Sequence, residues 1–393
     1  YHIYPLGLTG APAQNDFASP PAARLRQIEG WLDHIAAMGF NAIYIGPLFE
    51  SSSHGYDTAD YLAVDRRLGT CDDLKKLCGE MRRRGIRIVF DAVFNHVGRD
   101  FPWFRDLRRN GEQSPFADRF AGLNFSESNP LGDPFSYECW QGHHSLVKLD
   151  CTSARVREYL VSIVIRWIEE FDIDGLRLDA ADCIDREFLT QLRDACTVIK
   201  PDFWLMGEVV HGDYRTWAGT CIDSVTNYEA YKGLYSSHND ANYFEIAYSL
   251  KRQFGEAGIY RDMLLYSFAD NHDVDRIASQ LADERHLYPL HCLLFTMPGV
   301  PSVYYGSEFG IHGKKQGGSD AQLRPHLTLD DLQSHAPHPR LADAVRKLSR
   351  IRHESPALRR GSFAEAFVEH RRYGFFRTSE EETVLGMEST SDH

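Results

Sequence analysis

The sequence predicts an α/β protein of the (β/α)8 TIM-barrel class, with a short insert after the third strand and a small or truncated C-terminal β region. Three observations support this prediction. Short apolar strands alternate with amphipathic helices, eight strand segments can be counted, and no Gly-x-Gly-x-x-Gly segment opens a helix. Repeated βα units favour a parallel sheet, and eight of them favour a closed barrel over an open doubly wound sheet.

The predicted elements follow one another along most of the chain. Strands are expected at residues 2–5, 42–47, 86–93, 175–179, 204–208, 223–227, 264–268 and 300–305. Helical periodicity predicts helices at residues 23–38, 72–84, 154–171, 184–199, 243–254, 286–296 and 340–353. In such a barrel the carboxyl ends of the strands meet at one mouth, so side chains there gather around a common space.

One connection is much longer than the others. Residues 97–148 are rich in Gly, Asn, Pro, Ser and aromatic residues and have no clear period. A loop of this length in a compact domain is usually functional or forms a small subdomain. We therefore predict a barrel formed by residues 1–96 and 149–356, an inserted subdomain at 97–148, and a partial C-terminal β region at 357–393.

Composition excludes several classes of partner. The net charge of −13 and a pI near 5.8 argue against nucleic acid and anionic membranes as partners, and no apolar run is long enough to span a bilayer. The eight Cys show no zinc-type spacing. Their expected state as reduced, buried thiols favours a cytoplasmic protein. Secretion stays open, because a leader could have been removed before Tyr1.

Acidic residues stand at the same end of several predicted strands. The third, fourth, fifth and seventh strands end in DAVFNH (residues 91–96), GLRLDA (175–180), MGEV (206–209) and FADNHD (268–273). A single acid in such a place is usually a helix cap or an ion-pair partner. Several acids on separate strands, with two His and one Arg beside them, form a cluster that acid–base chemistry needs and a barrel does not.

These four segments resemble, in the same order, the four short signatures of the α-amylase family of glycoside hydrolases. Residues 41–49 and the segment GVPSVYYGSE (299–308) resemble two supporting signatures, and the resemblance extends from about residue 3 to residue 324. It implies a retaining hydrolase whose substrate is an α-glucan oligosaccharide or polysaccharide. It also implies that the insert at 97–148 is a subdomain of the B type that this family carries.

The resemblance implies a role for each of three acids. Asp179 is the expected nucleophile, Glu208 the general acid/base, and Asp273 the third acid, which binds ring hydroxyls and stabilises the transition state. A retaining glycosidase needs a carboxylate nucleophile and a protonatable carboxyl about 5–5.5 Å apart, on opposite sides of the anomeric bond.

Further residues are implied to bind the sugar or to position the acids: Tyr56, His96, Arg177, His272, Asp320 and Arg324. Tyr56, in the segment HGYD, is expected to stack beneath the cleaved sugar, and His96 and His272 to hydrogen-bond to it. Arg177 lies two residues before the expected nucleophile, where its charge can keep that carboxyl ionised. The other two residues are expected to form a supporting acid–Arg pair.

Two features point to one branch of the family. The segment LVKLD (146–150) resembles the MPKLN-type signature of the neopullulanase and cyclomaltodextrinase branch, and Asn227-Tyr228 matches a pair found there after the sixth strand. This favours hydrolysis of α-1,4 bonds in maltooligosaccharides or starch. A transglycosylase or isomerase would use the same three acids and remains the alternative. A non-catalytic sugar-binding barrel is disfavoured, since such proteins lose an acid. Endo or exo action, α-1,6 preference, chain length and oligomeric state stay open.

No cofactor is required by this chemistry. Calcium stays open because calcium-dependent members use the third-strand Asn, which is Asn95 here. The residues after the expected nucleophile are Ala180-Ala181-Asp182-Cys183, without the usual Lys-His pair. A neutral thiol is a poor ligand for a hard cation, so the sequence does not favour a calcium site.

Overall fold

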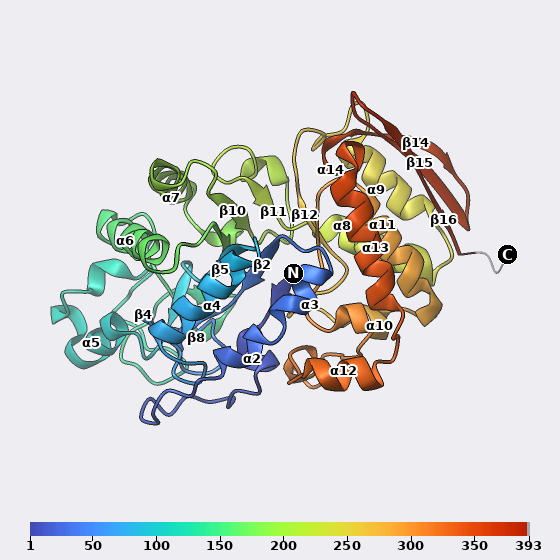
Figure 1. Ribbon diagram of the computed structural model, residues 1–393. Helices are drawn as coiled ribbons and strands as arrows, with labels where there is room; N and C mark the ends of the chain where they lie inside the picture. Colours follow the sequence, from blue (N-terminus) through green and yellow to red (C-terminus); the bar gives the residue numbers. More distant parts are fainter. Residues whose placement is uncertain (391–393) are drawn as a thin grey trace.

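The computed structural model describes residues 1–390, and eight of its strands form a closed parallel barrel (Figure 1). These strands are β1 (His2–Ile3), β2 (Ala42–Ile45), β5 (Arg87–Ala92), β9 (Gly175–Leu178), β10 (Trp204–Gly207), β11 (Ser224–Val225), β12 (Tyr266–Phe268) and β13 (Val300–Ser302). The first six pair in that order, and β12 pairs with β13. Parallel bridges from Thr226 to Tyr266 and from His2 to Tyr304 close the ring. The predicted fold class is confirmed.

Side chains alternate between the barrel interior and its outer surface, as the pleat of a strand requires. The interior contains a buried apolar cluster of Tyr44, Val89, Met206, Tyr266 and Phe268. Met206, Arg177 and Asp91 are neighbours in register on β10, β9 and β5. The charged members of this row therefore stand beside one another near the carboxyl ends of their strands.

Helices cover the outside of the barrel (Figure 1). Their bounds are α1 (Pro5–Leu8), α2 (Leu25–Glu29), α3 (Leu32–Ala37), α4 (Cys71–Arg83), α5 (Pro102–Asn110), α6 (Ala154–Phe171), α7 (Arg186–Ile199), α8 (Tyr228–Asn239), α9 (Phe244–Phe254), α10 (Ile277–Gln280), α11 (Leu287–Thr296), α12 (Leu329–His335), α13 (Leu341–Glu354) and α14 (Pro356–Arg360). Helix α6, for example, buries Leu160, Val164, Trp167 and Phe171.

Two connections differ from the predicted pattern. The helix expected at 23–38 is divided into α2 and α3 around Gly30, a residue that is entropically unfavourable in a helix interior. The backbone of Gly30 stays near-helical (φ −63°, ψ −17°), so the division is a kink and the chain direction is kept. The connection from β11 to β12 contains two helices, α8 and α9, where only the one at 243–254 is predicted. The connection from β10 to β11, for which no helix is predicted, contains only a 3-10 turn at Tyr214–Thr216.

The insert and the loop after β2 carry small antiparallel sheets beside the barrel mouth. The hairpin β3 (Phe49–Ser51) and β4 (Thr58–Val64) follows β2, and β6 (His96–Gly98), β7 (Cys139–Trp140) and β8 (His143–Lys148) form a three-stranded sheet in the order β6-β8-β7. The ring of Phe104 on α5 lies 5.4 Å from that of Phe120 and 5.1 Å from that of Tyr137, which gives the insert an aromatic core.

The C-terminal region forms the antiparallel sheet β14 (Ser362–Val368), β15 (Arg372–Thr378) and β16 (Thr383–Ser389) beside α9 and α11 (Figure 1). Phe363, Tyr373 and Phe375 are its buried apolar members, and Arg377 and Glu388 are buried as well. The predicted short strands are confirmed, and residues 391–393 of the predicted 357–393 region lie outside the described residues. The limits of the three predicted units stay predictions. No helix within residues 1–390 is both long and apolar enough to cross a membrane.

Candidate active site

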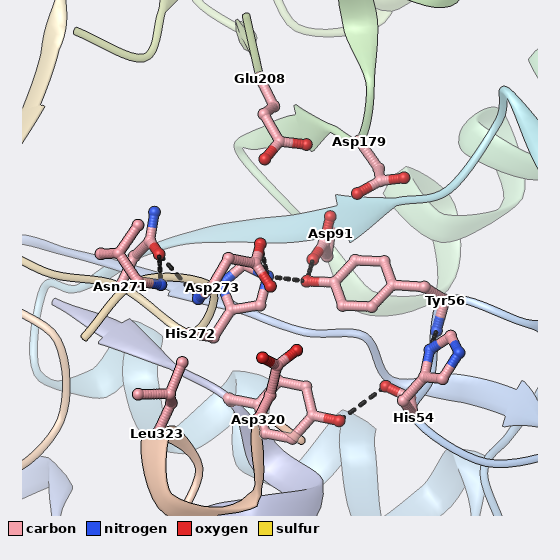
Figure 2. Close-up of polar contacts among 12 residues, drawn as sticks. His54, Tyr56, Asp91, Asp179, Glu208, Asn271, His272, Asp273, Asp320 and Leu323 are labelled. Carbon is pink, nitrogen blue, oxygen red and sulfur yellow. Dashed lines mark hydrogen bonds and ion pairs between the residues drawn. The ribbon is translucent and has the colours of Figure 1, made fainter. Parts of the chain in front are cut away.

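The three predicted catalytic acids lie at one end of the barrel. Asp179 directly follows β9, Glu208 directly follows β10, and Asp273 lies in the loop after β12. The carboxyl groups of Asp179 and Glu208 point into the space above Asp273 and Tyr56 (Figure 2). Because the carboxyl ends of all barrel strands meet at this mouth, residues far apart in the sequence share one site.

Arg177 connects the carboxylates on the barrel side of this site. Its Nη1 lies 3.0 Å from Asp91 Oδ1 and 2.8 Å from Asp179 Oδ1, and its Nη2 lies 2.9 Å from Glu208 Oε2. Its side chain is only 3% exposed. A planar guanidinium has five donors in a fixed fork, and one such group can therefore hold several carboxylates at set positions. Asp179 and Glu208 are in this way bound to the same cation.

The environment of Asp179 acts on its proton affinity in two directions. Burial raises the pKa of the Asp179 carboxyl well above its usual value, and the negative charges of Glu208 and Asp91 raise it further, while the Arg177 guanidinium opposes the rise. Three carboxylates around one guanidinium leave this half of the site with an excess of negative charge. A proton therefore binds here more readily than at an exposed Asp.

Glu208 is held by the backbone as well as by the guanidinium. The N–H of Ala180 donates to Glu208 Oε2 at 3.1 Å. Ala180 has a left-handed backbone (φ 44°, ψ 46°), a conformation that is uncommon for a residue with a Cβ. This turn, placed directly after Asp179, aims the N–H at Glu208. Such strained residues concentrate at functional sites.

Tyr56, His272 and Asp91 form a hydrogen-bonded chain (Figure 2). The Tyr56 hydroxyl donates to Asp91 Oδ2 at 2.8 Å, and Nε2 of His272 lies 2.5 Å from the same hydroxyl oxygen and 2.9 Å from Asp273 Oδ2. Since a carboxylate only accepts, we assign the imidazole proton to Nε2. The rings of Tyr56 and His272 are nearly parallel, with centroids 5.4 Å apart.

Asp273 has basic partners on its other side. Arg324 Nη2 lies 2.8 Å from Asp273 Oδ1 and 3.0 Å from Asp320 Oδ2, and Arg324 Nε donates to the His272 carbonyl at 3.0 Å. Burial alone would raise the pKa of the Asp273 carboxyl, but His272 and Arg324 outweigh it and hold that pKa far below its usual value. The predicted Asp320–Arg324 pair is therefore present in the structure, and it contacts the third acid directly.

His96 stands beside the expected nucleophile. Its Nε2 lies 3.9 Å from Asp179 Oδ2, and this buried nitrogen has no hydrogen-bond partner within residues 1–390. Burial lowers the pKa of His96 to about 4, so the ring is neutral at physiological pH. The Asn95 side-chain amide lies 3.1 Å from His96 Nδ1. In the described part of the chain no three His, Cys, Asp or Glu side chains gather where they could hold a metal ion.

Two further residues, Asp91 and Tyr44, hold the site together, and the sequence analysis gave neither of them a role. Asp91 accepts from Tyr44 at 2.9 Å and from Tyr56 at 2.8 Å, and it binds Arg177 with its second oxygen. Both Asp91 and Tyr44 are buried. The signal was present, because Asp91 begins the DAVFNH segment and Tyr44 lies in the middle of an apolar strand, where a hydroxyl needs a partner.

Comparisons with known proteins agree with this geometry. The profile of the α-amylase catalytic domain matches residues 22–338. A cyclomaltodextrinase from Bacillus sp is 32% identical over 364 residues, which are 90% of this chain and 63% of that protein. Neopullulanase 2 from Thermoactinomyces vulgaris is 30% identical over 367 residues, 90% of this chain and 60% of that protein. The chain thus spans less than two thirds of the length of these relatives.

Solved structures share the fold over nearly the whole chain. The cyclic α-maltosyl-(1→6)-maltose hydrolase from Arthrobacter globiformis, in complex with cyclic α-maltosyl-(1→6)-maltose, superposes with a TM-score of 0.86 at 27% identity. The superposition covers 98% of this chain and 89% of that one. The catalytic-domain profile matches well over half of the chain, and the barrel and its strand-end acids agree with it: the chain belongs to the α-amylase family.

Proposed function

We propose that this protein is a retaining hydrolase of α-1,4-glucosidic bonds in maltooligosaccharides and starch-type α-glucans. One observation carries the proposal: a single buried guanidinium, that of Arg177, binds the carboxyls of both Asp179 and Glu208. Two carboxyls held side by side at a barrel mouth are the groups that double displacement at an anomeric carbon needs.

In the first step an Asp179 oxygen attacks the anomeric carbon while the bond from that carbon to the glycosidic oxygen breaks. Glu208 donates its proton to the departing oxygen, which leaves as a hydroxyl. The result is a β-linked glycosyl ester on Asp179. In the second step Glu208, now a carboxylate, takes a proton from water as the water oxygen attacks the same carbon, and Asp179 is released. Two inversions restore the α configuration.

The remaining residues have supporting roles in this proposal. Asp273 is kept ionised by His272 and Arg324, so its charge can stabilise the positive charge that develops on the sugar ring. The Nε2 of His96 has no hydrogen-bond partner within residues 1–390 and is available to a sugar hydroxyl. The ring of Tyr56 offers an aromatic face to the sugar.

The substrate class rests on the relatives. The names cyclomaltodextrinase and neopullulanase describe enzymes that act on α-glucans, and the first of these relatives matches 90% of this chain. Because the chain spans only part of those proteins, the bond type and the preferred substrate are part of the proposal.

The test is a product profile on maltoheptaose and on β-cyclodextrin, with the wild type and Asp179→Asn. We expect short malto-products from both sugars and a loss of kcat on the order of 10⁴-fold in the variant. The matched control is Asp202→Asn, an acid 78% exposed that pairs with Arg87 across the opposite end of the barrel; its activity should stay unchanged. Longer or rearranged sugars would instead indicate a transferase. No turnover of either sugar, or an active Asp179→Asn, would overturn the proposal.

A further inference from the structure

Two loops meet beside Asp273 at the barrel mouth. The loop after β12 contains Asp273 and ends at Arg276, directly before α10. The loop after β13 contains Arg324, which binds Asp273, and Asp320, which binds Arg324. In Figure 2, Asp320 and Leu323 come from one short turn of that second loop. The place of Arg324 at Asp273 therefore depends on what holds this turn.

Arg276 is a buried residue that joins the two loops. Its Nη1 donates to the Tyr305 carbonyl at 2.7 Å, near the start of the second loop, and its Nη2 donates to the Leu323 carbonyl at 2.8 Å, where the short turn ends. Its backbone N–H donates to the Gly313 carbonyl at 2.9 Å, between these two points. One residue thus fixes the start, the middle and the end of the loop segment that leads to Arg324.

The Leu323 carbonyl connects Arg276 with Arg324. This oxygen also accepts from the Tyr304 hydroxyl at 3.1 Å, so both of its lone pairs are used. The Arg276 guanidinium in turn lies over the Tyr304 ring, 3.9 Å from its centroid. Because a peptide bond is planar, fixing the Leu323 oxygen fixes the plane that contains the Arg324 nitrogen. From there the Arg324 side chain reaches Asp273 at 2.8 Å.

Arg276 has a carboxylate of its own close by. The Ser307 hydroxyl accepts from Arg276 Nη1 at 3.1 Å and lies 2.9 and 2.8 Å from the two carboxylate oxygens of the buried Asp270. Burial raises the pKa of the Asp270 carboxyl, and the Arg276 guanidinium opposes that rise. The charge of Arg276 is therefore matched one hydroxyl away, and its connection to Asp273 passes through Arg324.

We propose that Arg276 is a positioning residue, which holds the loop after β13 so that the Arg324 guanidinium stays against the Asp273 carboxylate. The inference rests on the proposed function, in which Asp273 must remain charged. Without Arg276 the loop segment is released at both ends, and Arg324 is less firmly held at Asp273. A buried carboxylate that loses a cation binds a proton more readily. The loss of rate in an Arg276 variant should therefore grow as pH falls, as in a variant of Arg324.

The experiment is a double-mutant cycle on kcat/KM for maltoheptaose, measured at about pH 4 and at pH 8. Arg276→Met should lower kcat/KM about fivefold at pH 8 and by a larger factor at the lower pH. If Arg324→Met alone costs about tenfold, Arg276→Met combined with Arg324→Met should also cost about tenfold, because the contact that Arg276 supports is already gone. Independent effects would instead multiply to about fiftyfold.

The matched control is Arg377→Met. Arg377 is also a buried arginine that donates to two carbonyls, those of Thr296 at 2.7 Å and Gly361 at 3.0 Å, but it lies in the C-terminal sheet. Thermal unfolding should show a lower Tm for both variants, whereas only Arg276→Met should make kcat/KM depend more strongly on pH. If Arg276→Met does not fold, Arg276→Lys decides by the same cycle with Arg377→Lys as its control, since an ammonium has no fork to bind both ends of the loop segment.

The outcomes separate the two proposals. Losses that multiply in the double variant would mean that Arg276 does not act through Arg324. An equal loss at both pH values, or the same pH dependence in the Arg377 variant, would mean that Arg276 only stabilises the fold; each of these results overturns the inference. Absence of wild-type turnover of maltoheptaose and β-cyclodextrin, or activity of Asp179→Asn, would instead overturn the proposed function.

Discussion

The two halves of the active site carry opposite electrostatic arrangements. On the barrel side, Arg177 faces the three carboxylates of Asp91, Asp179 and Glu208. On the loop side, Asp273 faces Arg324 and His272. Three carboxylates share one cation in the first half, whereas in the second the carboxylates of Asp273 and Asp320 are paired with Arg324 and Lys315. Accordingly, the pKa of the Asp179 carboxyl is raised and that of the Asp273 carboxyl is lowered.

This difference shows how the surroundings of each carboxyl group can suit it to a different function within one site. A carboxyl group that must take up and release a proton, as Glu208 does in the proposed mechanism, benefits from a crowded, anionic setting, while one that must remain charged throughout benefits from permanent cations. The structural elements differ in the same way. Strands β5, β9 and β10 carry the first half, and loops after β12 and β13 carry the second.

The largest expected effect comes from weakening the cation of the barrel side. Arg177→Lys keeps a charge but has no fork to bind three carboxylates, so kcat should fall about 100-fold. The pKa of Asp179 should rise further, because an ammonium without the fork contacts Asp179 less closely and opposes the effect of its burial less. As Asp179 must be ionised to attack, the acidic limb of the kcat/KM profile should move to higher pH. The measurement is that profile between pH 4 and pH 9.

The matched control is Arg87→Lys, at an arginine 63% exposed on the opposite end of the barrel. It should leave both kcat and the acidic limb unchanged. If the acidic limb does not move in Arg177→Lys, the pKa that this limb reports is not that of Asp179.

A smaller effect is expected on the loop side. Arg324→Met removes one of two basic partners of Asp273 and leaves the other, so kcat/KM should fall about tenfold. The pKa of Asp273 should rise toward its ordinary value, and the loss of rate should deepen as pH falls through that raised pKa. Steady-state kinetics at about pH 4 and at pH 8 would detect the difference.

Asp320→Asn is the comparison for that variant. It removes the second partner of Arg324 but keeps the contact between Arg324 and Asp273, so its effect should be weaker. If Asp320→Asn matched or exceeded Arg324→Met, the contact between Arg324 and Asp273 would not be the one that matters.

The smallest effect is expected from removing divalent cations. The charge balance described above comes entirely from side chains, and no three acidic, His or Cys side chains within residues 1–390 could hold a metal ion. Dialysis against EDTA should therefore change kcat by less than about twofold. A larger loss that calcium restores would reopen Asn95 as a ligand and add a third source of positive charge to the site.

The sequence predicted the barrel strands and the acids at their ends, but it did not predict most of the contacts among the side chains of the site. The eight strands were expected within a few residues of their observed positions, because buried parallel strands are continuous apolar runs bounded by turns. The kink at Gly30 and the helix α8 (Tyr228–Asn239) were not expected. Helix propensity summed over a window of residues does not show where packing against neighbouring elements interrupts a helix or allows one to form.

The internal contacts depend on register and side-chain conformation. Asp91 and Arg177 are register partners on β5 and β9, but no pattern within either segment reveals the pairing. The Asp320–Arg324 pair was predicted through a family resemblance, whereas the contact from Arg324 to Asp273 joins residues 51 apart in the chain. Such contacts become apparent only when the closed barrel brings residues that are distant in the sequence together.

The most direct test of the central claim is the configuration of the first product. Proton NMR should be recorded during the first minutes of maltoheptaose cleavage by wild-type enzyme, before the released sugars mutarotate. The account predicts that the α anomer of the new reducing end appears first, because the ester on Asp179 forces two inversions. Initial appearance of the β anomer would mean a single displacement by water and would contradict Asp179 as the nucleophile.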